Sequence, residues 1–337
     1  MRDTTLKSLW ISWYPHRRTT GLCDAWGIPL EVIPSHHAGW RKWLGQAVAT
    51  LTLLRRHRPE VLFVQNPSLG LTVLATWVRW WFGYLLVVDA HNEGVRPFVR
   101  SSGFVRRLTR HLLRRADFTI VTNTALAEDV RRAGGRPLIL PDRLASPPAA
   151  ALDGEVPGSL APDIMVISTY APDEPLPAIL AAAERMPEVR FAVSGNAKKF
   201  GALGLEQPAN VELTGFLPDD AYWGTLARSK VILDLTLMPD CLVCGAYEGL
   251  ALARPMVLSD NPATRELFGH GAILTGGEPK GIVAALGQAL SGLESLEARA
   301  RESRDSFRVR WEKQAQGVQQ AIVDGAHRPG TRGAERN

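Results

Sequence analysis

The chain has few cysteines, and this shortage narrows the kinds of site it can carry. Only three of its 337 residues are cysteine, and two of them, Cys241 and Cys244, form a C-x-x-C pair. A secreted disulfide framework needs more, so we expect a cytoplasmic protein. Because the sequence has no second C-x-x-C and no H-x3-H, it does not favour a zinc site. We interpret both cysteines mainly as small packing residues, with a redox pair as the alternative.

Long apolar runs are scarce as well. The longest, LGLTVLATWVRWWFGYLLVV at 69–88, has Arg79 at its middle and Gly83 near its end. This pattern predicts a helix followed by a buried strand, so we expect no membrane span. The start, MRDTTLKSLWISW, lacks the apolar segment of a signal peptide.

Positive charge is in excess. The net charge of +5 favours an anionic partner, such as phosphate groups, acidic lipid or nucleic acid. Arginines concentrate at 41–58 and 100–115, where the spacing predicts basic amphipathic helices. No recognisable nucleic-acid motif is present, so we expect no nucleic-acid partner.

Five tryptophans accompany these basic stretches: Trp40, Trp43, Trp77, Trp80 and Trp81. One interpretation is docking on an anionic membrane, peripheral on the inner face of the cell membrane. The other is that the tryptophans belong to the core and the arginines are solvated. The sequence leaves both open.

Short β-branched runs alternate with helical patterns along the chain. Eleven such runs occur: SLWIS, EVLFVQ, YLLVVDA, FTIVT, PLILP, DIMVIST, RFAVSG, NVELTG, KVILDL, PMVLSD and AILT. Apolar strands separated by helices are typical of parallel sheets covered on both faces. We therefore predict an α/β protein with two Rossmann-like doubly wound domains. The expected parts are a first domain at 1–145, a linker at 146–162, a second domain at 163–296, helices at 297–325 and a disordered tail at 326–337.

In the first half, polar side chains follow two predicted strands. FVQNPSLG places Asn66 after one strand, and VVDAHNEG places Asp89, His91 and Asn92 after the next. Ligands of open parallel sheets bind beyond these strand ends, although helix capping or a turn could explain any single residue. His91 is the best candidate for chemistry in this half, because a histidine can accept a proton near neutral pH.

In the second half, two strand ends could contact a diphosphate. STYAPDE supplies Ser168 and Thr169, and SGNAKK supplies Gly195, Asn196 and Lys198. Hydroxyls and backbone N–H groups at helix starts favour phosphate, whereas the alternative is that the lysines are simply solvated.

The segment DCLVCGAYEGLALARP combines carboxylates with a helix start. The pattern predicts a helix from near Gly245 to before Pro255. Glu248 lies one turn into it and Asp240 lies in the loop before it, so each could accept hydrogen bonds from vicinal hydroxyls.

These motifs resemble the GT-B glycosyltransferases of the group 1 type over roughly residues 9–270. DCLVCGAYEGLALARPMVLSD is similar to the E-x7-E motif and the strand after it, with Asp240 in the position of the first glutamate. NVELTGFLPDDAYWGTLARSKVILDL and NPATRELF are similar to other stretches of the family. VQNPSLG, DAHNEG and STYAPDE look most like the chitobiosyldiphosphodolichol β-mannosyltransferase-like branch.

The resemblance implies a GT-B fold, with an acceptor domain followed by a nucleotide-sugar domain and with C-terminal helices crossing back to the first domain. It implies these donor-binding residues: Ser168, Thr169, Gly195, Asn196 and Lys198 at the diphosphate, Phe216 and Leu217 at the base, Glu248 at the ribose, and Cys244, Gly245 and Ala246 at the helix start. It implies His91 and Asp240 as catalytic residues beside the sugar, with Asn66, Asp89 and Asn92 on the acceptor side.

Three features depart from the family pattern. STYAPDEP lacks the arginine and lysine of the group 1 G-R-x-x-x-x-K-G segment, and Asp240 has a shorter reach than glutamate. SWYPHRRTTGL, with Arg17 and Arg18, replaces the N-terminal Gly-Gly loop.

The expected function is transfer of a hexose from a nucleoside diphosphate sugar to an acceptor hydroxyl, on a polysaccharide or a lipid-linked glycan intermediate. We expect no cofactor and no metal, and the chain has no D-x-D sequence. A helix N-terminus and Lys198 would then stabilise the leaving diphosphate. The alternatives are a GT-B-fold sugar-nucleotide epimerase or hydrolase and a non-catalytic binding module.

Overall fold

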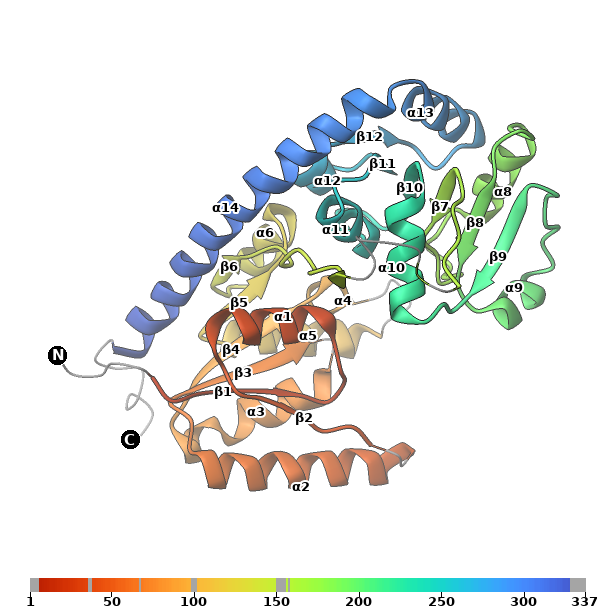
Figure 1. The fold of residues 1–337 in the computed structure, drawn as a ribbon. Helices are drawn as coiled ribbons and strands as arrows, with labels where there is room; N and C mark the ends of the chain where they lie inside the picture. Colours follow the sequence, from red (N-terminus) through yellow and green to blue (C-terminus); the bar gives the residue numbers. More distant parts are fainter. Residues whose placement is uncertain are drawn as a thin grey trace. The chain divides into compact units, whose positions relative to one another are not determined.

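The structure is a computed structural model that describes residues 6–35, 38–66, 68–97, 102–149, 156 and 158–327. The chain forms two compact units, each with its own sheet (Figure 1). Unit 1 combines residues 1–143 with 310–337, and unit 2 comprises residues 144–309.

Unit 1 is built on a parallel six-stranded sheet in the order β2-β1-β3-β4-β5-β6. Its strands are β1 (Ser8–Ser12), β2 (Leu30–Val32), β3 (Val61–Asn66), β4 (Leu85–Ala90), β5 (Phe118–Val121) and β6 (Pro137–Ile139). Every residue of β3 and β4 is buried, which explains why these strands are largely apolar instead of alternating. The direction of winding reverses between β1 and β3, so a ligand is expected beyond the carboxyl ends of these strands.

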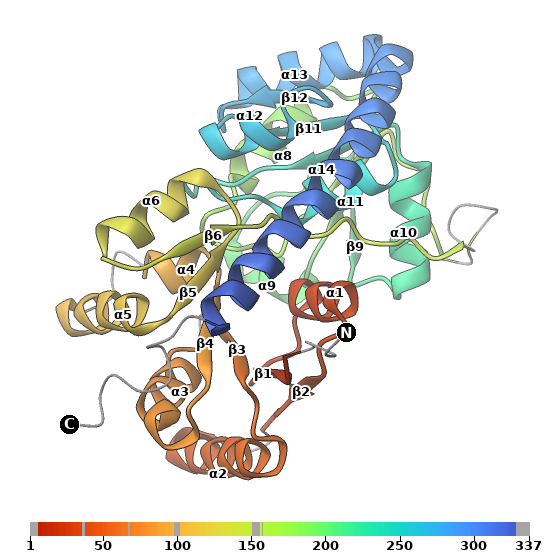
Figure 2. The same cartoon turned by 90° about the vertical axis from the view of Figure 1, so that its left-hand side faces the viewer.

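The helices of unit 1 are α1 (Arg17–Trp26), α2 (Gly39–His57), α3 (Leu69–Phe82), α4 (Asn92–Val95), α5 (Gly103–Arg115) and α6 (Thr124–Arg132). The helices α2, α3, α5 and α6 pack side by side in that order. The connection from β1 to β2 runs along the sheet in the opposite direction from the connections that lead to β3, β4, β5 and β6. The helix α1 therefore covers the face of the sheet opposite to α2, α3, α5 and α6 (Figure 2).

Unit 2 holds a second parallel six-stranded sheet, in the order β12-β11-β10-β7-β8-β9. Its strands are β7 (Ile164–Val166), β8 (Phe191–Ser194), β9 (Val211–Gly215), β10 (Val231–Asp234), β11 (Met256–Ser259) and β12 (Ala272–Thr275). Its helices are α8 (Leu176–Glu184), α9 (Ala197–Leu203), α10 (Asp219–Arg228), α11 (Cys244–Ala251), α12 (Pro262–Phe268) and α13 (Pro279–Ser291). The winding reverses between β7 and β10, so the ends of these strands are the expected ligand position in this unit.

The last helix, α14 (Leu293–His327), contributes to both units. In unit 2, Phe307 stacks on Phe268 with ring centroids 6.2 Å apart. In unit 1, Trp311 donates from Nε1 to the carbonyl of Pro141 at 2.9 Å, and Gln314 donates to the carbonyl of Ile139 at 2.7 Å. The unit 1 portion buries Trp311, Ala315, Val318, Ile322 and Ala326, which recur at the spacing of one helix face.

The predicted fold class, α/β with two doubly wound parallel sheets, is confirmed. All eleven predicted runs form strands, and 69–88 is a helix followed by a strand. Within the described residues, the one unpredicted strand is β2, an edge strand of three residues that are all at least partly exposed, and it carries too little apolar sequence to be recognised. No helix in the described ranges combines the length and the apolar character needed to cross a membrane.

Parts of two predicted segments lie outside the described residues. These are residues 150–155 and 157 of the expected linker and residues 328–337 of the expected tail.

Candidate functional site

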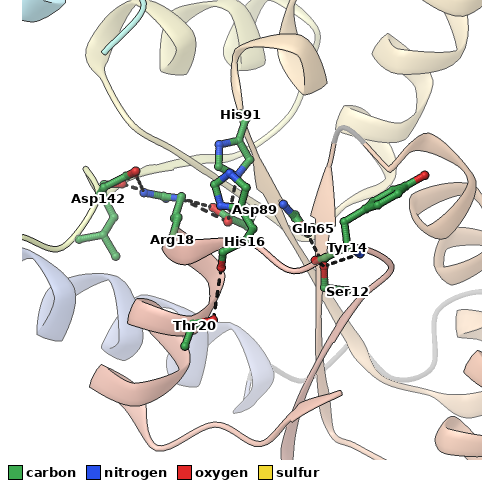
Figure 3. Close-up of polar contacts among 10 residues, drawn as sticks. Ser12, Tyr14, His16, Arg18, Thr20, Gln65, Asp89, His91 and Asp142 are labelled. Carbon is green, nitrogen blue, oxygen red and sulfur yellow. Dashed lines mark hydrogen bonds and ion pairs between the residues drawn. The ribbon is translucent and has the colours of Figure 1, made fainter. Parts of the chain in front are cut away.

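In unit 1, polar side chains gather where β1, β3 and β4 end (Figure 3). Asp89 lies in β4 and is fully buried, and His91 follows the strand as the residue before α4. Asn66 ends β3, paired in register with Ala90 of β4. The structure therefore brings the residues of the two predicted strand ends together.

A buried arginine organises this edge of the sheet. Arg18, in the first turn of α1, donates from Nε to both carboxylate oxygens of Asp89, at 2.9 and 3.2 Å. Its other nitrogens donate to Asp142 Oδ1 at 2.5 Å and to the carbonyl of Leu140 at 3.0 Å. The guanidinium is therefore a fixed positive charge that joins α1, β4 and the segment after β6.

His91 packs against a second histidine, which the sequence did not single out. The ring centroids of His16 and His91 lie 4.4 Å apart. His91 Nε2 lies 3.8 Å from Asp89 Oδ2 and has no hydrogen-bond partner among the described residues. Desolvation lowers the pKa of both histidines, although the charges of Asp89 and Asp142 oppose the shift. Both imidazoles are therefore neutral at neutral pH, as a general base must be.

Asn66 is held by the turn that follows His91. Its Nδ2 donates to the carbonyl of Gly94 at 3.2 Å, and the backbone N–H of His91 donates to the carbonyl of Asn66 at 3.0 Å. A Cβ on Gly94 would lie 3.0 Å from Asn66, so the close approach favours glycine here. Asn66 Oδ1 is buried with no hydrogen-bond partner in the described part of the chain, which leaves an acceptor for a ligand. Asn92 is the first residue of α4 and is partly buried.

The loop after β1 is tied to β3 as well. Ser12 Oγ hydrogen-bonds with the side chain of Gln65 and lies 2.5 Å from the carbonyl of Tyr14 (Figure 3). One sign of this loop's role is present in the sequence, because SWYPHRR directly follows the first predicted strand. Its polar residues were not assigned because only the strand order shows that β1 lies beside β3.

In unit 2, the hydroxyls predicted for a diphosphate are occupied by a carboxylate. Glu174 accepts from Ser168 Oγ at 2.5 Å, from Thr169 Oγ1 at 2.8 Å and from the Thr169 backbone N–H at 3.0 Å. No motif in the sequence singled out Glu174. An anion bound by Ser168 and Thr169 would have to displace this carboxylate or share its donors.

The turn after β8 has the shape that the sequence predicted. Gly195 has a φ of +126°, and a Cβ there would lie 2.8 Å from the ring of Tyr170, so glycine is needed. Asn196 caps α9 by accepting from the Lys198 backbone N–H at 3.0 Å. The Lys198 side chain is exposed, whereas Lys199 Nζ lies 3.4 Å from the carbonyl of Thr169.

The turn after β9 presents an aromatic ring. Phe216 is 75% exposed and follows Gly215, whose φ is +68°. Leu217 is partly buried. An exposed ring at the end of a strand can stack on a planar ligand group.

Glu248 is a buried carboxylate of unit 2. Its side chain lies in the second turn of α11 and is 7% exposed. Tyr222 of α10 donates from its hydroxyl to Glu248 Oε2 at 2.5 Å. Burial and the negative charge of Glu248 raise the pKa of Tyr222 well above its ordinary value, so the phenol stays a donor. The sequence did not indicate Tyr222, because 26 residues separate the two partners.

The start of α11 is closed by a second buried carboxyl group. Asp234, the last residue of β10, accepts from the Gly245 backbone N–H at 2.8 Å. Burial raises the pKa of Asp234 well above its usual range, and Glu248 and Glu174 add to the shift. A Cβ on Gly245 would lie 2.5 Å from Asp234 Oδ2, so glycine is needed for this contact. The backbone N–H of Gly245, at the helix start where an anion was expected, is therefore already hydrogen-bonded to Asp234.

The remaining predicted residues surround this helix start. Ala246 is buried in α11, and Asp240 lies in the preceding loop with a φ of +54°. None of the three cysteines, all of which lie within the described residues, forms a disulfide. Cys244 is exposed and Cys241 is partly buried, so the interpretation of Cys244 as a packing residue is wrong. It is the first residue of α11, and the seven residues that follow it in the helix are the buried ones.

Two family models match the chain. Residues 12–141 match the Glycosyl transferase 4-like domain, and residues 177–319 match the Glycosyl transferase-like model. The first range contains the strand ends of unit 1, and the second contains the ends of β8, β9 and β10 together with α11. The chain is a glycosyltransferase of the group 1 type. No curated protein matches this glycosyltransferase in sequence.

Solved structures share the architecture of the glycosyltransferase. HepE of Anabaena, crystallised with UDP and glucose, is 16% identical with a TM-score of 0.72, over 94% of this chain and 99% of that one. Sucrose-phosphate synthase from Thermosynechococcus elongatus is 14% identical with a TM-score of 0.74, over 94% and 98%. A UDP-forming trehalose-phosphate synthase from Burkholderia xenovorans is 12% identical with a TM-score of 0.71, over 96% and 100%. The predicted GT-B fold is confirmed.

Proposed function

We propose that the enzyme transfers a hexose from a nucleoside diphosphate sugar to a hydroxyl of a polysaccharide or lipid-linked glycan intermediate. The observation that carries the proposal is the buried Glu248, fixed by Tyr222 near the strand ends of unit 2. HepE was crystallised with UDP-glucose, which supports a nucleotide-sugar donor for this fold. The sequence motifs favour the chitobiosyldiphosphodolichol β-mannosyltransferase-like branch.

On the donor side, we assign each residue by its chemistry. Glu248 accepts from the ribose hydroxyls, Asp240 contacts the sugar, and the exposed ring of Phe216 with Leu217 faces the base. The diphosphate lies along the loops that follow β7 and β8. Its contacts are Ser168, Thr169, Gly195, Asn196 and Lys198, with Lys199 added from its position beside Thr169.

On the acceptor side, His91 accepts the proton of the attacking hydroxyl. The acceptor oxygen forms the new bond to the anomeric carbon, and the bond to the diphosphate breaks with its electrons. Asn66 Oδ1 and Asn92 orient the acceptor. The carboxylate of Asp89 is paired with the guanidinium of Arg18, so it does not act as a second base.

We propose that no metal ion or cofactor is needed. Backbone N–H groups at helix starts and the two lysines after β8 would stabilise the charge on the leaving diphosphate. This proposal is tested by comparing rates in a chelator with rates in added Mg²⁺ or Mn²⁺. Loss of activity in the chelator, restored by either ion, would contradict it.

Donor binding is the first test of the function. A thermal-shift series with UDP-, GDP- and ADP-sugars should show that one nucleotide raises the melting temperature, since ligands that bind only the native state stabilise it. Glu248→Ala should remove most of that shift, and Glu188→Ala, an exposed glutamate of the same unit, should retain it.

Turnover separates transfer from the competing activities. With the stabilising donor, product formation should require an added glycan acceptor. Donor consumption at the same rate without acceptor would indicate an epimerase or hydrolase instead. No shift with any nucleotide sugar would leave a binding module as the better assignment.

A further inference from the structure

The tryptophans that accompany the basic helices lie on the surface of unit 1. Trp40, Trp43, Trp77, Trp80 and Trp81 are between 52 and 72% exposed. Leu44 and Val48 of α2 are also more than half exposed, and Phe104 of α5 is 73% exposed. The interpretation that these tryptophans form the core is therefore wrong. A soluble monomer rarely exposes this much contiguous apolar surface unless it binds something there.

The exposed rings border a groove rather than a flat patch. Between α2 and α3 the groove has a volume of about 820 Å³, and its walls include Trp43, Leu44, Trp77, Trp80 and Trp81. A Cβ on Gly70 would lie 1.5 Å from the Trp43 ring, so the glycine makes room for this indole. Trp43 also packs edge-on against Trp13, with centroids 5.6 Å apart. The groove is thus part of the packed structure of these helices.

The same helices carry charge of one sign. Together, α2, α3 and α5 contain ten lysines and arginines and no aspartate or glutamate. The rest of the chain, with 29 basic and 34 acidic residues, is acidic on balance. The net positive charge of the protein therefore comes from these three helices.

A second, basic pocket adjoins the groove. It has a volume of about 410 Å³ and is lined by Arg107, Arg110, His111 and Arg114 of α5 with Arg132 of α6. Leu108, between two of these arginines on α5, lines the apolar groove. The helices α2, α3, α5 and α6 pack side by side in that order (Figure 2). The apolar groove and the basic pocket, which share α5, therefore lie on one surface.

We propose that this surface docks on a phospholipid bilayer that contains anionic lipids. The tryptophan rings enter the interfacial layer, an acyl chain of the bilayer occupies the groove, and the arginine pocket binds lipid phosphate. A bilayer offers an apolar layer directly beside a layer of phosphates, which is the order in which groove and pocket lie. A protein partner is less favoured, because interface cores are depleted of charge and this surface has no acidic residue on its three main helices.

The proposal does not depend on sugar transfer, although docking would give the enzyme access to a lipid-linked acceptor. It is tested by flotation of the full chain with two kinds of vesicle, phosphatidylcholine alone and an equal mixture with phosphatidylglycerol. The protein should float with the mixed vesicles at low salt and much less with neutral ones. Brominated acyl chains should quench its tryptophan fluorescence, because the rings lie at the acyl boundary.

Two surface variants separate the two parts of the site. Trp77→Ser with Trp81→Ser should reduce brominated-lipid quenching and vesicle affinity, and Arg107→Glu with Arg110→Glu should reduce affinity by about tenfold or more. Arg185→Glu with Arg308→Glu is the matched control, since both arginines are exposed in unit 2 and the net charge changes equally. Circular dichroism and nucleotide-sugar thermal shifts should be unchanged in all variants.

Three outcomes would overturn the proposal. One is failure of the native chain to bind mixed vesicles at low salt. Another is equal loss of binding in the control pair, which would show attraction by net charge alone. The third is sedimentation of the native chain as an oligomer that the tryptophan variant abolishes, without vesicle binding, because the surface would then be an interface between copies.

Discussion

His91 shows how its surroundings set the chemistry of a single residue. Burial beneath His16 lowers its pKa from the ordinary 6.5, and the nearby carboxylate of Asp89 only partly compensates. The neutral form therefore persists to more acidic pH than in an exposed histidine. A residue in this state accepts a proton across the whole neutral range.

We expect transfer to depend on this neutral imidazole. Because the pKa of His91 is lowered from 6.5, the midpoint of the acid limb of kcat/KM should lie below pH 6.5. His91→Ala should lower kcat by about 100- to 10,000-fold and remove this acid limb of the pH profile. His270→Ala, an exposed histidine of unit 2, should leave both unchanged. If the pH profile of His91→Ala kept its acid limb, another residue would be the base.

Glu174 contacts the predicted diphosphate residues, although no motif in the sequence pointed to it. Its carboxylate holds the hydroxyls of Ser168 and Thr169, the groups proposed for the diphosphate. Displacing it costs binding energy and adds a like charge beside the phosphates.

Glu174→Ala should therefore bind free nucleoside diphosphate more tightly, by about tenfold for one hydrogen-bond equivalent released. Isothermal titration calorimetry measures the change directly. Glu184→Ala, exposed at the end of α8, is the control and should bind as the native chain does. Unchanged or weaker binding in Glu174→Ala would mean that the phosphates do not use these donors.

At the scale of elements, one ion-pair network fixes three segments of unit 1. Arg18 joins α1 to β4 through Asp89 and to the segment after β6 through Asp142 and Leu140. Because Arg18 and Asp89 are almost fully buried, removing the arginine would leave negative charge without a partner in a region closed to water.

Arg18→Ala should lower the free energy of unfolding of unit 1 by about 3–5 kcal/mol. Arg18→Lys should restore only part of it, since an ammonium cannot span three acceptors in a fixed plane. Urea denaturation followed by circular dichroism gives both values. Arg56→Ala, exposed on α2, should change stability by about 0.5 kcal/mol or less. If Arg18→Ala lowered the free energy of unfolding by no more than Arg56→Ala does, the network would not be a structural support.

Sequence patterns identified most strands and helices, because buried elements have runs or periodic patterns of apolar residues that neighbouring positions show. The runs that became β3 and β4 are apolar at nearly every position, since helices cover both faces of the sheet. The edge strand β2 shows almost no such pattern, and it was missed. The contact of Tyr222 with Glu248 shows none, because two side chains on different helices meet only after the sheet has formed.

At the scale of the whole molecule, two separate cores determine how the protein unfolds. One hydrophobic core packs against the first sheet and the other packs against the second, and α14 contributes to both units. Units with their own cores can unfold as separate cooperative transitions.

Calorimetry should therefore resolve two transitions. Trp311→Ala removes a buried ring of unit 1 and should cost about 3–5 kcal/mol in that unit, lowering only one transition. The nucleotide sugar should raise the other. Val309→Ala, 70% exposed on the same helix, should move neither by more than about 1 °C. A single transition that responds to both Trp311→Ala and the nucleotide would show one cooperative molecule.

The sequence by itself determined the α/β class, the eleven main strands and the group 1 resemblance, because apolar periodicity and short motifs are properties of neighbouring residues. It also brought His91, Asp89 and Glu248 forward as site residues, since strand ends and helix starts are recognisable locally. Only the tertiary structure decided that His16, Arg18 and Asp142 belong with His91, and that Glu174 occupies the donors of Ser168 and Thr169. It also decided that the tryptophans face outward, because which side of a helix is covered depends on what packs against it.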